Sequence, residues 1–164
     1  MEKFRFRRLA PTDFPVLLEW LSKKHVAEWW DDGDDTLGKI AAHYGAADET
    51  RRFLVLDGDK PIGYFQYYFD GDETIGIDQF IGDETYLNRG VGEKTIKMFV
   101  QLIAEKHNPA FIILDPSPEN ARAVRCYEKV GFRHYETREL EGGETAYIMR
   151  LKIPPAGERR KDKC

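Results

Sequence analysis

The stretch from residue 111 to 132 places the tightest limits on how this chain of 164 residues folds. It opens with a short apolar run, Phe111 to Asp115, of the kind that forms a buried strand. Pro116-Ser117-Pro118 cannot continue that strand and forces a turn. Asn120 then stands where a helix needs a side-chain cap, and Gly131 stands where the helix needs a glycine to end. The sequence therefore predicts a strand, a turn and a capped helix in direct succession.

A second predicted helix has its glycines at its start. Asn88-Arg89-Gly90-Val91-Gly92 runs straight into residues 93–107, where apolar side chains recur at the spacing of an amphipathic helix. Such a turn suits an anion, because backbone N–H groups and the helix dipole favour negative charge there. Two glycines at a turn are also common without any ligand. The loop is not a P-loop, since no Gly-Lys-Ser/Thr follows, and it lacks the first glycine of a dinucleotide fingerprint.

Alternating and helical apolar patterns account for most of the remaining chain. Asp57-Gly58 is a strong hairpin signal, and Glu141-Gly142-Gly143 separates two further strands. The patterns predict strands at Phe4 and Phe6 and at 52–57, 60–70, 74–81, 132–140 and 145–152, and helices from Pro11 to Leu21 and over 36–44. This order predicts an α+β fold in which helices flank a central mixed, mostly antiparallel sheet. We expect one domain over residues 1–152 and a charged tail over residues 153–164.

The composition suits a folded core and a reduced environment. Hydrophobic residues make up 41% of the chain, more than a disordered segment would contain. No apolar run reaches the roughly 18–20 residues that span a bilayer. Residues 1–8 alternate charges with aromatics, unlike a signal peptide. Only two cysteines occur, Cys126 and Cys164, so we expect a cytoplasmic protein.

The charge is modestly acidic and unevenly distributed. A net charge of −4 argues against nucleic acid or an anionic membrane as a partner. Much of the acidity lies in two short stretches, residues 31–35 and 70–73. Runs of this kind usually form solvated loops, but they would also attract a polycationic ligand. The sequence is compatible with both interpretations.

The helix after Asn120 carries a longer and more specific signature. Asn120-Ala121 followed by Tyr127-Glu128-Lys129-Val130-Gly131-Phe132 resembles the second half of the acetyl-CoA site of the GNAT acetyltransferases. Gly90-Val91-Gly92 matches the Gly-x-Gly pyrophosphate loop of that superfamily. One position departs from the pattern, because Leu87 stands where Gln or Arg is usual. The resemblance then implies that backbone amides hold the pyrophosphate.

Other blocks resemble one subgroup, the aminoglycoside 6′-N-acetyltransferases. In chain order they are Glu28-Trp29-Trp30, residues 61–68, Gly76-Ile77-Asp78-Gln79, residues 115–118 and residues 125–129. The resemblance implies the GNAT fold, acetyl-CoA as the co-substrate and a cationic small-molecule acceptor. The implied reaction is direct attack in a ternary complex, which moves the acetyl group to the 6′-amine of an aminoglycoside and confers antibiotic resistance.

Amide formation from a thioester needs a base for the amine and an acid for the leaving group. The resemblance implies that Asp78 meets the reactive amine as the base, whereas spacing alone favours an exposed strand residue. Tyr127 is the expected acid, because a phenol of pKa about 10 can donate to a thiolate whose thiol has a pKa near ~8.5. Asn120 and Tyr127 lie nearly two helical turns apart on one face, so they can hold the pantetheine arm and meet its sulfur.

The other site residues are implied by the resemblance. For the cofactor they are Gln79, Phe80, Ile81, Asn88, Arg89, Gly90, Val91, Gly92, Glu93, Asn120, Ala123 and Tyr127. For the acceptor they are Trp29, Trp30, Gln66, Tyr68, Asp78 and Asp115. Asp115 could instead stabilise the turn before Pro116, and the aromatic residues could fill the core. Adjacent tryptophans on a helix cannot both face the core, so one of them should line a cleft.

Other chemistries have less support. Cys126 has no histidine nearby in the sequence, and the 4 histidines lack metal-ligand spacing, so we expect neither a thiol nucleophile nor a metal. The acceptor could be a different amine, such as a hydroxylysine siderophore precursor or a protein N-terminus. A non-catalytic binder of acyl-CoA or of a drug is a third alternative, although a binder has no use for Tyr127 as an acid that protonates a leaving thiolate. We expect a monomer or a homodimer.

Overall fold

The computed structural model describes residues 3–158, so Cys164 and the end of the predicted tail lie outside the described part. The strands of that part are β1 (Phe4–Arg8), β2 (Arg51–Asp57), β3 (Lys60–Phe69), β4 (Thr74–Ile81), β5 (Phe111–Leu114), β6 (Arg133–Glu139) and β7 (Thr145–Lys152). Its α-helices are α1 (Phe14–Leu21), α2 (Lys24–Ala27), α3 (Leu37–Tyr44), α4 (Val91–His107) and α5 (Ala121–Val130). Short 3₁₀ turns, Pro11–Asp13 and Glu84–Tyr86, precede α1 and α4. None of the helices in residues 3–158 has the length and apolar character needed to cross a membrane.

The strands form a mixed sheet in the order β1-β2-β3-β4-β5-β7-β6. β4 and β5 are parallel, with Thr74 opposite Phe111, and α4 lies between them in the chain as the crossover that parallel strands require. The pairs β1–β2, β2–β3, β5–β7 and β6–β7 are antiparallel. The predicted α+β fold with a mixed, mostly antiparallel sheet is therefore confirmed.

The ends of several elements differ slightly from the prediction. The helix expected from Pro11 begins as a 3₁₀ turn, in which the Asp13 carboxylate accepts from the Ala10 N–H at 2.8 Å and from Arg7 at 2.9 Å. The helix expected from Glu93 begins at Val91. The short helix α2 was not predicted, because its four residues are too few to show a periodic pattern.

The described chain divides into two compact units. The N-terminal unit contains residues 3–68 and 77–95, and the C-terminal unit contains residues 69–76 and 96–158. β4 and α4 each pass from one unit into the other. The expected single domain over residues 1–152 remains a prediction.

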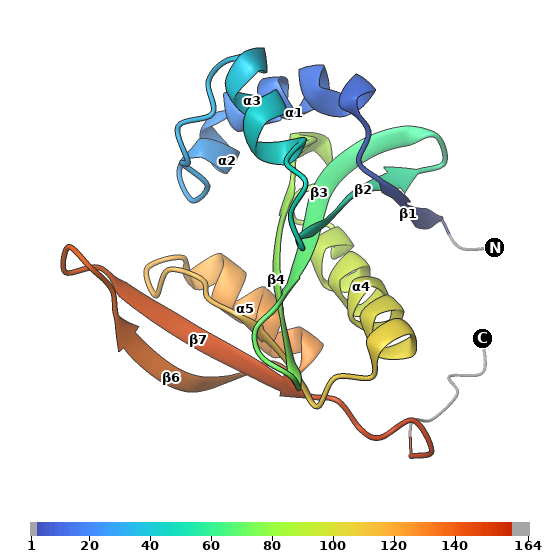
Figure 1. Ribbon diagram of the computed structural model, residues 1–164, viewed down its shortest axis with the longest axis vertical. Helices are drawn as coiled ribbons and strands as arrows, with labels where there is room; N and C mark the ends of the chain where they lie inside the picture. The colour runs from blue at the N-terminus through green and yellow to red at the C-terminus, as the bar shows by residue number, and fades with distance from the viewer. Residues whose placement is uncertain (1–2, 159–164) are drawn as a thin grey trace. The chain divides into compact units, whose positions relative to one another are not determined.

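The core of the N-terminal unit is built from helices packed on strands. Its buried members are Leu17 and Trp20 of α1, Ile40 and Tyr44 of α3, Leu54 and Leu56 of β2, and Tyr64 of β3. α1, α2 and α3, drawn in blue to cyan, gather at one end of this unit (Figure 1). α1 and α3 therefore each bury one apolar face in this core.

The core of the C-terminal unit lies along β5 and β7. Ile112 and Leu114 of β5 and Ile148 and Met149 of β7 are buried. β6, by contrast, is exposed along most of its length, as expected for the strand at the end of the sheet. The β6–β7 hairpin is the pair of long orange and red arrows in Figure 1.

Gly82 should tolerate no side chain, because a Cβ at this position would lie 2.1 Å from the buried Trp20 ring. We expect Gly82→Ala to lower the free energy of unfolding by about 1–3 kcal/mol. Gly38→Ala is a matched control, since its Cβ would meet only Thr36 Oγ1 at 4.0 Å on the exposed side of α3. This control should raise the free energy of unfolding by about 0.5–1 kcal/mol. Urea titration followed by circular dichroism measures both, and equal midpoints for the two variants would contradict the packing assigned to Trp20.

Candidate active site

Asp78 is held by a chain of two hydrogen bonds that starts in the core of the N-terminal unit. The Tyr64 hydroxyl donates to Gln66 Oε1 at 2.6 Å, and Gln66 Nε2 donates to Asp78 Oδ2 at 2.9 Å. Tyr64 and Gln66 are two residues apart on β3, so they share a face of the strand. Asp78 itself is half-buried on β4. Gln66, predicted to bind the acceptor, therefore also positions the predicted base, and its amide nitrogen retains a second N–H with which it can meet a ligand.

Aromatic rings enclose the start of this chain. The Tyr64 ring lies 5.8 Å from Trp30, 5.3 Å from Tyr44 and 5.5 Å from Phe80, measured between ring centroids. Burial raises the pKa of the Tyr64 hydroxyl well above its ordinary value, so the hydroxyl stays protonated and acts as a donor. Phe80 was predicted to bind the cofactor. Its ring belongs to this cluster instead, which leaves its main chain for that role.

The two adjacent tryptophans lie in the turn beyond α2. Trp29 is 44% exposed, whereas Trp30 is half-buried and donates from Nε1 to the Tyr44 hydroxyl at 3.1 Å. Because α2 ends at Ala27, the turn can send the two rings in different directions. Trp29 is therefore the tryptophan available at the surface, and Trp30 links the aromatic cluster to the acidic loop.

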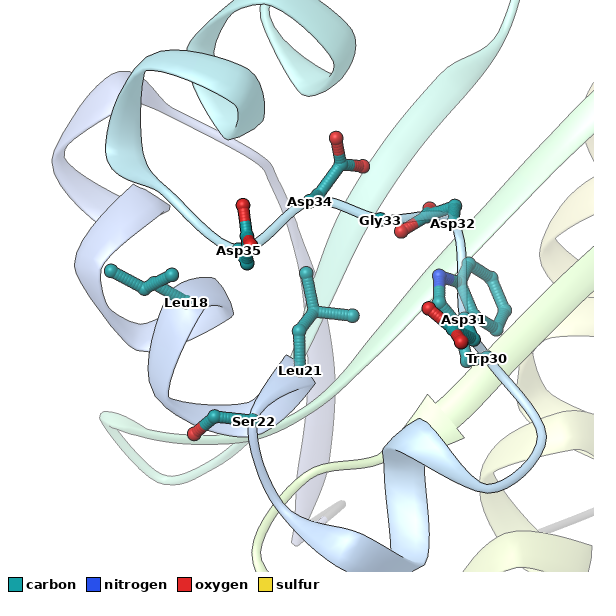
Figure 2. Close-up of a pocket in the computed structure, with 9 residues that line it drawn as sticks. All are labelled: Leu18, Leu21, Ser22, Trp30, Asp31, Asp32, Gly33, Asp34 and Asp35. Carbon is teal, nitrogen blue, oxygen red and sulfur yellow. The ribbon is translucent and has the colours of Figure 1, made fainter.

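The acidic loop, residues 31–35, lines a pocket together with Trp30 and residues of α1 (Figure 2). The Asp34 carboxylate lies 2.6 Å from His43 Nδ1, and Lys39 donates to Asp35 at 2.7 Å. The Tyr44 hydroxyl donates to Asp32 at 3.2 Å. Burial and the neighbouring Asp34 carboxylate raise the pKa of Asp32. The loop is thus anchored to α3 at several points and still presents a concentration of negative charge.

The glycine loop adopts the backbone that an anion cradle requires. Asn88 and Gly90 have φ of 60° and 74°, the left-handed region that glycine enters most readily. A Cβ at Gly90 would meet nothing within 4 Å, so the loop is open on that side. Lys94 N–H donates to the Gly90 carbonyl at 3.1 Å, and the N–H groups of residues 91–93 lie in the first helical turn, which has no intrahelical acceptor for them. Asn88 and Arg89 are exposed, and Glu93 is half-buried in that turn.

The remaining predicted residues of β3 and β4 are half-buried. Tyr68 lies near the end of β3, and Gln79 and Ile81 lie on β4. The Ile81 carbonyl lies 2.9 Å from His25 Nε2, so a residue that the sequence did not single out orients the end of β4.

The C-terminal unit supplies the capped helix. Asn120 Oδ1 accepts from the Ala123 N–H at 3.2 Å, which confirms the predicted N-cap. Gly131 ends the helix with φ of 123°, as predicted. The Tyr127 carbonyl accepts from the Gly131 and Phe132 N–H groups at 3.1 and 3.0 Å, and its ring is half-buried. The cap uses the Asn120 oxygen and leaves the amide nitrogen as the donor for a ligand.

Asp115 follows the last residue of β5 and is exposed to solvent. Partial desolvation by the surrounding protein still raises the pKa of its carboxyl above the ordinary value. A carboxylate in such a place is stabilised by a bound cation more than a fully solvated one would be.

Sequence analysis did not single out Tyr64, which contacts Gln66. The signal was present, because Tyr64 and Gln66 are two residues apart on β3 and must point to the same side. Its contact with Gln66 depends on side-chain geometry, which alternation does not specify.

The chain is similar to known proteins over nearly its whole length. Residues 10–140 match a family described as an acetyltransferase (GNAT) domain. The aminoglycoside N(6′)-acetyltransferase type 1 of Klebsiella pneumoniae is 32% identical over 164 residues, which cover 89% of this chain and 82% of the relative. The structure of AAC(6′)-Ib with paromomycin and acetyl-CoA matches with a TM-score of 0.87 at 29% identity, covering 99% of this chain and 100% of that one. The structure of AAC(6′)-Ib with coenzyme A and kanamycin matches with a TM-score of 0.82 at 30% identity, covering 91% and 94%.

Asp115→Asn should stabilise the protein at neutral pH. Because the folded-state pKa of Asp115 is raised above 3.8, the ionised carboxylate destabilises the fold at pH values above that folded pKa. The neutral amide removes this cost, so we expect the melting temperature to rise by about 1–2 °C at pH 7. The gain should vanish below about pH 3.8, where both folded and unfolded chains are protonated.

Thermal unfolding at pH 7 and pH 3.5 measures this effect. Asp59→Asn, at a fully exposed carboxylate, serves as the control and should change the melting temperature little. A gain of the same size at both pH values would show that desolvation of Asp115 is not its cause.

Proposed function

The chain belongs to the GNAT acetyltransferase family, and on that premise we propose that it transfers the acetyl group of acetyl-CoA to the 6′-amine of an aminoglycoside. The observation that carries this acceptor is the similarity to an aminoglycoside N(6′)-acetyltransferase along almost the whole chain. Solved relatives hold acetyl-CoA, or coenzyme A with kanamycin, in support of both substrates. Acetylation converts a charged amine into a neutral amide, which accounts for a role in antibiotic resistance. From the sequence we retain a cytoplasmic location and a monomeric or homodimeric state.

We assign to Asp78 the removal of a proton from the acceptor amine. An aliphatic amine is mostly ammonium at neutral pH and cannot attack a carbonyl until it loses a proton. The hydrogen bond from Gln66 Nε2 holds the Asp78 carboxylate in place to accept this proton. Asp78 takes this proton either directly or through one water molecule.

We assign to Tyr127 the protonation of the leaving thiolate. The amine nitrogen bonds to the thioester carbonyl carbon, the carbon–sulfur bond breaks, and coenzyme A leaves as a thiolate. Tyr127 donates its hydroxyl proton to that sulfur and is reprotonated from solvent. The proton taken by Asp78 returns to solvent, and so does the second proton that the nitrogen loses as the amide forms, so that one proton is released overall.

The glycine loop and the helix cap fit the two ends of the co-substrate. The N–H groups of the first turn of α4 suit the pyrophosphate, since Leu87 offers no polar side chain there. The Asn120 amide nitrogen suits a carbonyl of the pantetheine arm. Both assignments use polar groups that the fold leaves available at helix N-termini.

Acidic residues suit a polycationic acceptor. Asp115 has a raised pKa that a nearby ammonium would relieve, and the acidic loop concentrates negative charge beside Trp30. Trp29 adds an exposed ring on which a sugar can pack. We therefore assign the recognition of the amino sugar to these residues.

Thiol release from acetyl-CoA tests the proposed acceptor. We expect turnover with kanamycin and tobramycin and none with an analogue that carries a 6′-hydroxyl in place of the amine. Equal turnover with the hydroxyl analogue would contradict the 6′-amine as the site. No turnover with any aminoglycoside, despite acetyl-CoA binding, would exclude this acceptor and favour another amine.

Tyr127→Phe tests the assigned acid. Removing the hydroxyl should lower kcat by about 10²-fold, because general acid catalysis contributes on that scale. The ring and the helix remain, so the affinity for coenzyme A, measured by calorimetry, should change by less than about twofold. Unchanged turnover would exclude Tyr127 as the acid, whereas a non-catalytic binder would show no turnover in either the wild type or the variant.

A further inference from the structure

We propose that Tyr64 is a positioning residue for Asp78 and acts through Gln66. This inference rests on the proposed function, in which Asp78 takes the acceptor proton. It concerns a fully buried hydroxyl that has no access to either substrate from within the core.

The geometry gives the amide of Gln66 one favoured orientation. Its Oε1 lies 2.6 Å from the Tyr64 hydroxyl, and its Nε2 lies 2.9 Å from Asp78 Oδ2. A side-chain amide can rotate by half a turn at little steric cost, which would exchange the oxygen and the nitrogen. In the rotated state the amide oxygen would face a carboxylate oxygen, and two acceptors cannot bond each other. The Asp78 carboxylate therefore selects the amide nitrogen, and the Tyr64 hydroxyl binds the amide oxygen at the other end and so holds the Gln66 side chain in place.

The Tyr64 ring is packed on several sides. Its side chain is 0% exposed, and Trp30, Tyr44 and Phe80 surround its ring. The positive charge of Arg52 also acts on the Tyr64 hydroxyl. Arg52 is in turn fixed by two contacts of 2.9 Å with the Asp48 carboxylate.

Loss of the Tyr64 hydroxyl should weaken the placement of the base and leave the fold intact. Gln66 Oε1 would then lose its fixed contact, the Gln66 side chain would move more freely, and its hydrogen bond to Asp78 would be made for only part of the time. A carboxylate that is displaced from the amine lowers the rate of proton removal, because catalysis depends on a narrow geometry. Binding of acetyl-CoA does not involve this chain of hydrogen bonds and should be unaffected.

The first test is kinetic and uses a matched control. Tyr64→Phe should lower kcat with the aminoglycoside by about tenfold, the effect of one lost hydrogen bond, and leave the KM for acetyl-CoA within about twofold. Tyr67→Phe removes another fully buried hydroxyl from β3, on the opposite face, where Tyr67 stacks on Phe53 at 5.9 Å. This control should keep kcat within about twofold of the wild type. Equal kcat values for the two variants would overturn the inference.

A double-mutant cycle separates positioning from general loosening of the core. In a Gln66→Leu background, Tyr64→Phe should have little further effect on kcat, since the path to Asp78 is already broken. A tenfold loss in both backgrounds would show that Tyr64 acts by another route, and this outcome would contradict the proposal.

A spectroscopic test does not depend on turnover. In ¹H–¹⁵N spectra of the wild type, the side-chain amide protons of Gln66 should exchange slowly with water, and in Tyr64→Phe they should exchange about tenfold faster. If Tyr64→Phe does not fold, a slowly exchanging Tyr64 hydroxyl proton close to Gln66 in the wild type tests the same contact, and its absence would overturn the inference. If the wild type acetylates no aminoglycoside but these signals are present, the proposed acceptor fails and the positioning of Asp78 by Tyr64 stands.

Discussion

A tyrosine hydroxyl that is completely buried among aromatic rings must keep a hydrogen-bond partner, since an unpaired polar group there costs about 1–3 kcal/mol. Tyr64 is in this position, and Gln66 Oε1 accepts the hydrogen bond from its hydroxyl. The same amide then donates to Asp78. The packing of the N-terminal core and the placement of the proposed base are therefore linked through one side chain, and a change in either would disturb the other.

The two segments assigned to acetyl-CoA depend on a second constraint, the unsatisfied N–H groups at helix N-termini. At α4 the chain enters through the left-handed residues Asn88 and Gly90, so that the first turn presents backbone donors without a side chain in the way. At α5 the Asn120 side chain satisfies the Ala123 N–H and keeps its amide nitrogen as a donor. One helix end is left open for an anion, and the other is closed by a residue that can still bind.

Negative charge is concentrated in the acidic loop, which we assign to binding the acceptor. The acidic loop is anchored by His43, Lys39 and Tyr44, which distinguishes it from a freely solvated run of aspartates. The pKa of Asp32 is raised by burial and by the Asp34 carboxylate, so a cation placed there would relieve like-charge repulsion. The acidic loop is therefore an anchored surface loop, and its use as a site for a polycation is our proposal.

What the sequence by itself determined about this protein is mostly local. The hairpin at Asp57-Gly58, the Asn120 cap and the Gly131 helix end were predictable because each depends on the backbone preferences of a few adjacent residues. The family could also be identified, because its signature lies within one helix and one loop. Only the tertiary structure decided that Gln66 holds Asp78, that the Phe80 ring belongs to the core, and that Trp29 and Trp30 separate. These contacts join different strands and turns, and periodicity specifies which face a residue occupies but not which side chain it meets there.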